Sequence, residues 1–344
     1  MVEGTFPDDH MHYDEQGLLD HYTNIGQDIR AAYELGDDVD LSDEKAEFDR
    51  IIVLGMGGSA LSGEVLKLYL KRLGVKIPVI VSRSYSVPES LTEKSLVFTI
   101  SYSGNTEETV SAYRQAIRTA KHIVALSKGG KLEEITNLNR KPFLKVPKGF
   151  QPRTAALTYL FFPLLKILER YGLLPSHQSS IDQLVKGLAK PDFKSLAVSI
   201  SEKLEGKIPL IYTSEEYYPV AYRFKTQLNE CSKVHAFSNH FSELNHNEML
   251  AFTDLKAEFH IVLFNFDDDH RRIKKRMSLT REITAKYDVE TTEVKMSGDH
   301  LLTKLYSSMI IGDLTAFYLA LRYERDPSPV ELIEHFKERL GPFI

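Results

Sequence analysis

The stretch Ile51–Ala60, which reads IIVLGMGGSA, decides how this chain folds. Its first four residues are apolar and three of them are β-branched, a composition that predicts a strand buried on both faces. The glycines that follow predict a tight turn, and the apolar periodicity of Leu61–Leu70 predicts a helix directly after it. A strand, a glycine turn and a helix in this order are typical of α/β proteins in which a ligand approaches main-chain N–H groups.

Similar apolar runs recur along the chain, with amphipathic helical patterns between them. They lie at 79–81, 96–100, 123–126, 208–212 and 259–264. Continuous apolar strands about 20–25 residues apart are typical of βαβ units, so we expect an α/β fold on parallel sheets that are buried on both faces. The renewed alternation after residue 208 indicates a second unit of similar size and a structural duplication.

The domain boundaries follow from changes in this pattern. We expect an N-terminal helical segment over 1–47, a first, phosphate-binding domain over 48–175, and a second domain with the C-terminal helices over 176–344. Gly172 and Pro175 mark the boundary between the two domains, because both residues interrupt regular structure.

Three other segments carry informative patterns. A long helix over 153–171 contains Pro163, which is predicted to kink it. The helix over 301–323 is apolar on most sides and is predicted to pack in the core. The acidic run 267–269, followed by cations over 271–276, is interpreted as a solvated surface segment without a metal site.

Composition and charge exclude several classes of protein. A net charge of −5 argues against a nucleic-acid binder, which usually has a basic face. Met1–His10 lacks the apolar core of a secretory signal, and Lys304 and Asp313 interrupt the longest apolar stretch, which argues against a membrane span. The single cysteine, Cys231, excludes an internal disulfide and a cysteine-based zinc cluster. We therefore expect a cytoplasmic protein with no nucleic-acid or membrane partner.

The glycine turn has two alternative interpretations besides phosphate binding. It matches the dinucleotide fingerprint G-x-G-x-x-A, but a nicotinamide-binding protein usually places an acid after its second strand. Here that position reads VSRS at 81–84, and only Arg83 would suit the 2′-phosphate of NADP. An NADP-binding Rossmann enzyme and a purely structural turn both remain open.

The serine-rich run SYSGNTEET at 101–109 is the second candidate loop. Ser101, Ser103 and Thr106 lie where the third strand gives way to a helix. Hydroxyl groups together with the unpaired N–H groups and the positive dipole of a helix N-terminus form a phosphate site without any lysine. Both loops follow the carboxyl ends of parallel strands, where open α/β sheets bind ligands.

A simpler interpretation of the serine-rich run is an ordinary capped helix. In that case Asn105 or Thr106 would cap the helix, and Glu108 or Thr109 would complete a capping box.

Several motifs together resemble those of the sugar isomerase (SIS) domain superfamily. They are Gly57-Gly58-Ser59, the run 101–109, QPRT at 151–154, Asn229-Glu230 and ELNHNE at 243–248. More narrowly, the chain resembles the bifunctional phosphoglucose/phosphomannose isomerases from about residue 48 to its end. The resemblance implies two SIS domains, each a parallel sheet flanked by helices in a flavodoxin-like three-layer sandwich, with the active site in the cleft between them.

The same resemblance implies an aldose–ketose isomerase. It would interconvert glucose 6-phosphate and fructose 6-phosphate, and also mannose 6-phosphate and fructose 6-phosphate, by proton transfer through a cis-enediol. No metal or organic cofactor is implied, and the pathways expected are glycolysis and gluconeogenesis. The competing interpretation is a non-catalytic sugar-phosphate-binding SIS protein.

The resemblance assigns the proton-transfer groups to the second half of the chain. Glu230 would be the proton shuttle, since it precedes His246 by sixteen residues as in related SIS isomerases. His246 would open the sugar ring, because an imidazole titrates near neutral pH. In the family this histidine enters the site from the neighbouring subunit, which implies a homodimer. Glu248 is the rival base, expected to orient the loop.

The remaining site residues complete the implied constellation. Arg153 would stabilise the enediolate through its planar guanidinium, and Lys337 would be the second ring-opening residue. The phosphate would be held by Ser59, Ser101, Ser103 and Thr106, supported by Gly57 and Gly58.

One departure from the family concerns mannose phosphate. Its acceptance has been tied to a threonine near the carboxyl terminus that enlarges the pocket around C2, and this chain offers only Ser328 or Val330 there. Activity on glucose phosphate is therefore the firmer expectation.

Overall fold

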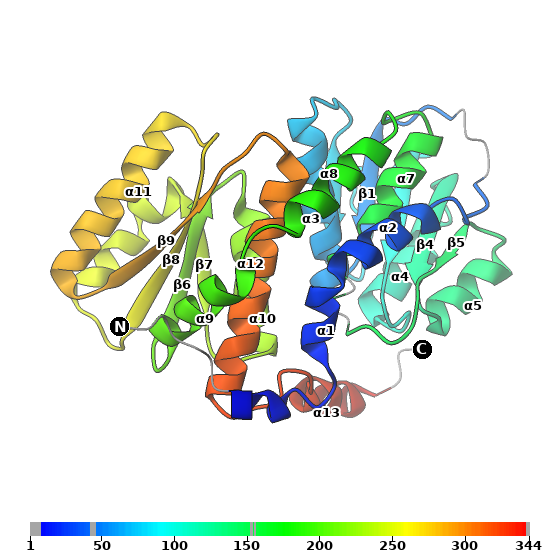
Figure 1. The fold of residues 1–344 in the computed structure, drawn as a ribbon. Helices are drawn as coiled ribbons and strands as arrows, with labels where there is room; N and C mark the ends of the chain where they lie inside the picture. Colours follow the sequence, from blue (N-terminus) through cyan, green and yellow to red (C-terminus); the bar gives the residue numbers. More distant parts are fainter. Residues whose placement is uncertain (1–7, 42–45, 152–153, 155, 342–344) are drawn as a thin grey trace. The chain divides into compact units, whose positions relative to one another are not determined.

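The computed structural model describes residues 8–41, 46–151, 154 and 156–341 (Figure 1). The chain divides into two compact units. The first unit is Thr23–Val185, and the second consists of the described residues of Met1–Tyr22 and Lys186–Pro342. Each unit is built around its own parallel sheet.

The sheet of the first unit has five parallel strands in the order β2-β1-β3-β4-β5. The strands are β1 (Arg50–Leu54), β2 (Val79–Ser82), β3 (Ser95–Ile100), β4 (His122–Ser127) and β5 (Phe143–Lys145). The flanking helices are α3 (Gly57–Arg72), α4 (Glu107–Ala116) and α5 (Gly130–Leu138). The four strands predicted from apolar runs are confirmed, and the strand order is the flavodoxin-like one.

Helices cover both faces of this sheet. Alternate residues of a strand point to opposite faces, so neighbouring residues of β1 pack against different helices. Ile52 and Leu54 of β1 pack with residues of α4 and α5 in one apolar cluster. Val53 faces the other way, where a Cβ on Gly63 of α3 would lie 2.8 Å from its Cγ1 atom. Every residue of β3 is buried, as expected for a strand covered on both sides.

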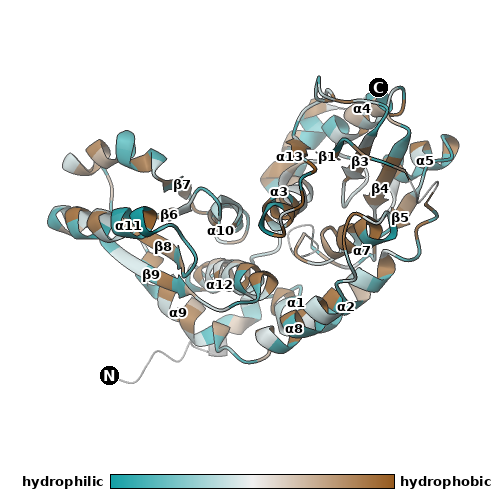
Figure 2. Cartoon of the chain, turned by 90° about the horizontal axis from the view of Figure 1, so that it is seen from above, coloured by the Kyte–Doolittle hydropathy of each residue, from teal (hydrophilic) through white to brown (hydrophobic). Residues whose placement is uncertain are grey.

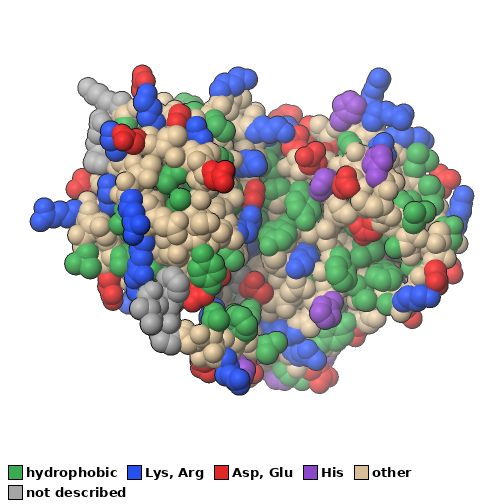
Figure 3. Space-filling view, turned by 180° about the vertical axis from the view of Figure 1, so that it is seen from behind, with side chains coloured by type: hydrophobic (Ala, Val, Ile, Leu, Met, Phe, Trp, Pro, Cys, Tyr) green, Lys and Arg blue, Asp and Glu red, His purple; other side chains and the backbone are tan. Residues whose placement is uncertain are grey.

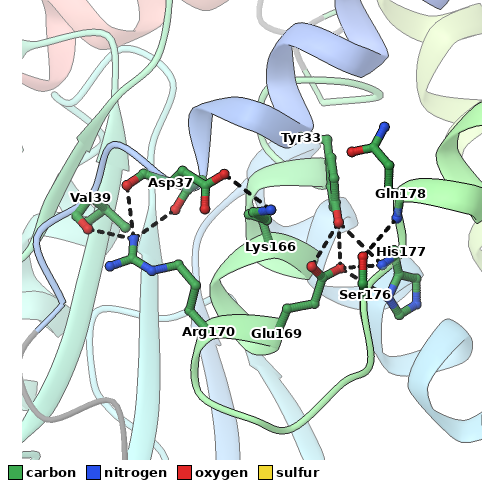
Figure 4. Close-up of polar contacts among 10 residues, drawn as sticks. Tyr33, Asp37, Val39, Lys166, Glu169, Arg170, Ser176, His177 and Gln178 are labelled. Carbon is green, nitrogen blue, oxygen red and sulfur yellow. Dashed lines mark hydrogen bonds and ion pairs between the residues drawn. The ribbon is translucent and has the colours of Figure 1, made fainter.

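Two N-terminal helices, α1 (Leu18–Thr23) and α2 (Ile25–Leu35), confirm the helical pattern predicted before the first strand. Figure 4 shows how α2 is tied to α7 (Phe162–Arg170). Tyr33 donates a hydrogen bond to Glu169, which also accepts one from the main-chain nitrogen of His177 at 2.8 Å. Arg170 donates to three main-chain carbonyls beyond the end of α2, including that of Val39 at 2.7 Å. The Arg170 bonds hold the chain that follows α2 against the end of α7.

The long helix predicted over 153–171 is wrong in its first half. Residues 156–161 form turns, and α7 begins at Phe162, so Pro163 lies in the first turn of a new helix and does not kink an existing one. Proline is favoured there because its missing N–H group is one that the first turn leaves unpaired.

The sheet of the second unit has four parallel strands in the order β7-β6-β8-β9. They are β6 (Ile208–Ser214), β7 (Phe237–Phe241), β8 (Phe259–Phe266) and β9 (Glu290–Met296). Their order repeats that of β2-β1-β3-β4, which agrees with the predicted duplication. The prediction included β6 and β8 but not the two edge strands, whose residues are less continuously apolar.

The helices of the second unit complete its core. The α-helices that follow α8 (Gln178–Leu188) are α9 (Phe193–Leu204), α10 (Tyr218–Glu230), α11 (Arg271–Thr284), α12 (Leu301–Arg322) and α13 (Glu331–Leu340). Short 3-10 helices are η1 (Asp8–Tyr13), η2 (Glu243–His246), η3 (Glu248–Thr253) and η4 (Ala285–Tyr287). Nearly all residues of α12 are buried, which confirms its predicted core role.

A buried ion pair joins α10 to α12. Arg223 donates to the two carboxylate oxygens of Asp313 at 2.9 and 2.6 Å, and both side chains are almost completely buried. Close packing accompanies the pair, since a Cβ on Gly312 would lie 2.9 Å from Phe224 Cβ. Helix α10 is therefore fixed against α12 at Arg223 and Phe224.

Helix α11 differs in polarity from the central strands of the first sheet. In Figure 2, α11 is largely in the teal of hydrophilic residues, whereas β3 and β4 are largely brown. The face in Figure 3 carries lysine and arginine side chains interspersed with aspartate and glutamate. Among the described residues, none of the helices combines the length and apolar character that a membrane crossing requires.

Candidate functional site

The first candidate site lies at the carboxyl ends of β1 and β3. In the order β2-β1-β3 the chain leaves β1 in one direction and β3 in the other, so the loops after them flank a topological switch point. The strands are paired in register, with Leu54 opposite Thr99. The glycine turn and the serine-rich run therefore meet there, and we call this place the first switch point.

Neither helix that begins at the first switch point has a side-chain cap. Met56 precedes α3 and Thr106 precedes α4, and neither side chain accepts a hydrogen bond from its helix. The Thr106 hydroxyl instead bonds the Ser101 hydroxyl, with 2.9 Å between the oxygens. The capping box considered for this run is thus not formed. A helix N-terminus without a side-chain cap can use its first N–H groups to bind an anion, although in α3 the Ser59 N–H donates to the Met56 carbonyl.

Glycine is required in the serine-rich run. Gly104 has a φ of +74°, and a Cβ there would lie 1.7 Å from the carbonyl oxygen of Gly129. Its N–H group donates to Ser101, while the Asn105 N–H donates to the Ser103 hydroxyl at 3.2 Å. The Asn105 side chain accepts from Lys131, which fastens the loop to the start of α5.

The glycine turn is tightly packed where it faces the sheet, at Gly55, and open at Gly57. A Cβ on Gly55 would lie 2.9 Å from the carbonyl oxygen of Ile100, so only glycine fits beside β3. A Cβ on Gly57, whose φ is +50°, would meet no heavy atom within 4 Å. The main chain of Gly57 and Gly58 therefore leaves room for a ligand, with the buried Ser59 in the next position of α3.

The side chain considered for NADP binding is engaged elsewhere. Arg83 Nη1 pairs with Glu64 Oε1 of α3 at 2.8 Å. A 2′-phosphate at this place would have to compete with that carboxylate.

The equivalent place in the second unit, between the carboxyl ends of β6 and β8, is the second switch point. Its loops carry acidic side chains, and the Lys304 ammonium of α12 lies 2.8 Å from both Asp267 and Asp268. Tyr217 donates to Asp268 at 2.9 Å. Burial alone would lower the pKa of Lys304, but its bonds to the two carboxylates outweigh burial and raise it. The prediction of a surface segment is confirmed, since Asp267 and Asp268 are exposed, but it did not include the buried Lys304 that pairs with both carboxylates.

Glu230 is the last residue of α10 and is half-buried. Two bonds fix the chain around it. Asn229 Nδ2 donates to the carbonyl of Val234 at 2.8 Å, and Ser232 donates to the carbonyl of Ala316 in α12 at 2.7 Å. Because α10 connects two parallel strands, it carries the chain from the carboxyl ends of the sheet back to its amino ends. Glu230 therefore lies at the amino-end edge of the second sheet.

His246 lies at the other edge. It ends η2, which follows the carboxyl end of β7, and its side chain is exposed. Glu248, two residues on, is held firmly: Tyr212 donates to one carboxylate oxygen and Asn239 to the other at 2.6 Å. Burial and Glu248 together raise the pKa of Tyr212 far above its ordinary value. These bonds support the orienting role expected of Glu248.

The two remaining predicted residues are placed differently. Arg153 lies outside the described residues. Lys337 lies on α13, every residue of which is exposed.

Sequence reasoning missed two lysines that the structure places at important positions. Lys304 was interpreted only as an obstacle to a membrane span, and its acidic partners lie more than thirty residues earlier in the chain. Lys233 follows Glu230 by three residues and donates to the Glu230 carbonyl. The proximity in sequence to the Asn229-Glu230 motif was the only available signal.

Comparisons with known proteins identify the family of this chain. Residues 46–133 match the family model described as SIS domain, and residues 193–340 match that of the bacterial phospho-glucose isomerase C-terminal SIS domain. The chain is similar to the bifunctional phosphoglucose/phosphomannose isomerase of Caldicellulosiruptor bescii, with 36% identity covering 94% of this chain and 99% of the relative. It is also similar to the enzyme of that name from Thermoplasma acidophilum, with 34% identity covering 86% and 90%.

Solved structures share the fold at low sequence identity. A hypothetical protein from Thermus thermophilus matches with a TM-score of 0.71 and 15% identity, covering 98% of this chain and 97% of the other. The tagatose-6-phosphate ketose/aldose isomerase of Escherichia coli matches with a TM-score of 0.61 and 14% identity, covering 95% and 96%. Two SIS folds joined in one polypeptide, with similarity to curated relatives along almost the whole length, place the chain in the bifunctional phosphoglucose/phosphomannose isomerase family.

Proposed function

We propose that this chain is an aldose–ketose isomerase that interconverts glucose 6-phosphate and fructose 6-phosphate, with mannose 6-phosphate as a second substrate. The observation that carries the proposal is similarity to enzymes of that name over 94% of the chain, at 36% identity. The first switch point supports it, because a hydroxyl-lined loop beside two uncapped helix N-termini suits a phosphate ester.

The substrate phosphate binds at the first switch point. Ser59, Ser101, Ser103 and Thr106 donate hydroxyl hydrogen bonds, and the N–H groups at the starts of α3 and α4 add main-chain donors. Holding the dianion there keeps the sugar carbons at a fixed distance from the anchor, so that a base can reach C1 and C2.

Glu230 moves the proton. In the direction from glucose 6-phosphate, its carboxylate removes the proton from C2 of the open-chain sugar and returns it to C1 of the cis-enediolate. The guanidinium of Arg153 stabilises the negative charge of that enediolate. No oxidant or reductant is consumed, because the oxidation of C2 to a ketone matches the reduction of C1 to an alcohol, and the O2 hydroxyl proton passes to O1.

Ring opening is assigned to His246 and Lys337, and the proposal includes a homodimer. Glu230 ends α10 at the amino-end edge of the second sheet, whereas His246 of the same chain follows the carboxyl end of β7 at the other edge. This separation supports a site in which the neighbouring subunit supplies His246. The buried Cys231 is consistent with the proposed cytoplasmic location, and the proposed pathways are glycolysis and gluconeogenesis.

The decisive experiment replaces the base. In the full-length protein, Glu230→Gln is expected to lower kcat by about a thousandfold while fructose 6-phosphate still binds, since only the proton acceptor is lost. A coupled assay with each hexose phosphate measures turnover, and calorimetry measures binding. Glu202→Gln, at an exposed position on α9, is the matched control and should retain wild-type rates.

The competing functions give different results. A non-catalytic sugar-phosphate binder would bind fructose 6-phosphate but turn over neither substrate in the wild-type form. An NADP-dependent enzyme would gain thermal stability from NADP and not from a hexose phosphate. Either result would overturn the proposed function.

A further inference from the structure

We propose that Tyr85 is a positioning residue for anion binding at the first switch point, because its hydroxyl holds the Glu107 carboxylate away from the start of α4. The inference rests on the proposed function, in which the start of that helix helps to bind the substrate phosphate. It concerns the loop 83–91, which follows β2.

The loop 83–91 lies beside both helices that begin at the first switch point. Strand β2 is the neighbour of β1, and the two strands end together in register. After β2, Arg83 pairs with Glu64 of α3. Farther along, Val87 and Leu91 pack against the apolar cluster that includes residues of α4. The loop therefore borders the first switch point from the side of β2.

Two contacts join Tyr85 to α4. Its hydroxyl donates to a carboxylate oxygen of Glu107, the first residue of α4, and its carbonyl accepts from Gln115 Nε2 at 2.8 Å. The bond to Glu107, followed by burial and the negative charge of Glu108, raises the pKa of Tyr85 to about 12. The phenol therefore keeps its proton throughout the neutral pH range and remains a donor to Glu107.

The Glu107 carboxylate matters because of its place in the helix. Thr106 does not cap α4, since its hydroxyl bonds that of Ser101. A carboxylate in the first turn is attracted to the positive end of the helix, and from there it repels a phosphate dianion. A carboxylate that is bonded to Tyr85, a donor outside the helix, competes less with an anion for the N–H groups of α4.

Loss of the phenol hydroxyl releases this carboxylate. In Tyr85→Phe the ring and the main-chain bond from Gln115 remain, so the loop keeps its place while Glu107 loses its donor. The released carboxylate turns toward the N-terminus of α4 and competes with the phosphate. The contact thus predicts weaker anion binding that depends on the charge of Glu107 and requires no contact between Tyr85 and the ligand.

A double-mutant cycle in the full-length protein tests the inference, with calorimetry of inorganic phosphate and of fructose 6-phosphate as the measurement. Tyr85→Phe is expected to raise the Kd of both ligands about threefold or more, and Glu107→Gln should bind them at least as tightly as the wild type. In the Glu107→Gln background, Tyr85→Phe should change the Kd by less than about 1.5-fold. Tyr287→Phe and Glu134→Gln, at exposed positions, are the matched controls and should not change it.

Turnover gives a second measurement that a merely structural role of Tyr85 would not produce. In Tyr85→Phe, the KM for glucose 6-phosphate should rise by the same factor as the Kd, whereas kcat should change by less than about twofold, because the repulsion acts on the anchored phosphate and not on the reacting carbons. Higher ionic strength should narrow the difference in KM between wild type and variant, since salt screens the charge of Glu107.

Three outcomes would overturn the inference and leave the proposed function standing. They are an unchanged Kd in Tyr85→Phe, a loss from that substitution that is equally large in the Glu107→Gln background, and weaker binding in Glu107→Gln alone. The last measurement decides the matter if Tyr85→Phe does not fold. A wild type that binds neither inorganic phosphate nor fructose 6-phosphate overturns the phosphate site of the proposed function, and this inference with it.

Discussion

The two switch points have the same strand topology and opposite chemistry. The first, between β1 and β3, is bordered by glycines and hydroxyls and by two helices without side-chain caps. The second, between β6 and β8, is bordered by carboxylates, and the buried Lys304 ammonium bridges two of them. The first switch point offers hydrogen-bond donors to a bound anion. The second switch point already contains the Lys304 ammonium and the carboxylates that pair with it.

This difference teaches that a duplicated fold supplies two equivalent positions for a ligand, whereas the loop residues decide whether either is used. At the second switch point the carboxylates repel a phosphate, and the bonds among Lys304, Asp268 and Tyr217 fix the turn from β6 into α10. That helix ends with Glu230. The second switch point thus has a structural part in placing the predicted base.

The largest effect is expected from Gly104→Ala at the first switch point. The added Cβ would overlap the Gly129 carbonyl, and the φ of +74° is costly for alanine. We expect fructose 6-phosphate binding to be lost in calorimetry and stability to fall by about 3 kcal/mol in urea unfolding.

Gly206→Ala is the matched control for that variant. Gly206 has a similar φ of +72°, but a Cβ there would meet nothing within 4 Å. It should lose only about 1 kcal/mol of stability and retain binding. Equal effects of the two substitutions would contradict the special role of the first switch point.

A smaller effect is expected from Lys304→Met at the second switch point. Removing the cation leaves the Asp267 and Asp268 carboxylates close together, although Asp267 is 42% exposed. We therefore expect the free energy of unfolding to fall by about 2 kcal/mol at pH 7. Hexose phosphate binding should not change. The hydrogen bond from Lys304 lowers the pKa of Asp267, so this stabilisation is present above the ordinary aspartate range and is lost as the pH falls through the lowered value.

Urea unfolding at pH 7 and pH 3.5 measures both parts of this prediction. The difference between wild type and Lys304→Met should shrink at the lower pH. Lys295→Met, an exposed position on β9, serves as the control. A loss of hexose phosphate binding in Lys304→Met would show that the second switch point takes part in ligand binding after all.

The smallest effect concerns acid stability, where the two sheets also differ. The second sheet contains the buried His260 in β8, whereas all residues of the corresponding β3 are neutral. Burial, with help from Lys207 and Lys203 and against Glu290, lowers the pKa of His260 to about 4. The unfolded chain therefore binds a proton at a higher pH than the folded one, and stability falls as the pH drops from about 6.5 toward 4.

His260→Gln tests this contribution, because glutamine can keep a bond to Thr292 but does not titrate. Between pH 7 and pH 5, the free energy of unfolding of the wild type should fall by roughly 1–2 kcal/mol more than that of the variant. Identical pH dependence of the two unfolding curves would contradict the prediction.

The fold was predictable wherever strands are central. Runs such as 96–100 are apolar throughout because helices cover both faces, and that pattern is visible in the sequence. The edge strands β5, β7 and β9 were missed. Strand β5 has only three residues, and Ser238, Asn239 and His240 in β7 and the alternating polar residues in β9 do not form an apolar run. An edge strand is only partly covered, so burial does not impose such a run on it.

The meeting of the glycine turn and the serine-rich run at the first switch point was predictable, whereas the hydrogen bonds within these loops were not. The hydroxyl of Thr106 could have capped α4, yet it bonds Ser101, a choice between two nearby partners of similar strength. The Lys304 cluster required contact between residues far apart in sequence, which no local pattern indicates. The domain boundaries at 47 and 175, and the roles of all the predicted site residues, remain predictions.

The sequence by itself determined the central strands, the glycine-containing turns after them and the helices that follow. Apolar periodicity and glycine geometry act over a few neighbouring residues, so they are visible in the sequence. Only the tertiary structure decided that the second switch point holds the buried Lys304, and that Glu230 and His246 lie at opposite edges of one sheet. Those outcomes depend on long-range pairing of strands and helices, whose partners are chosen by the packing of the whole unit.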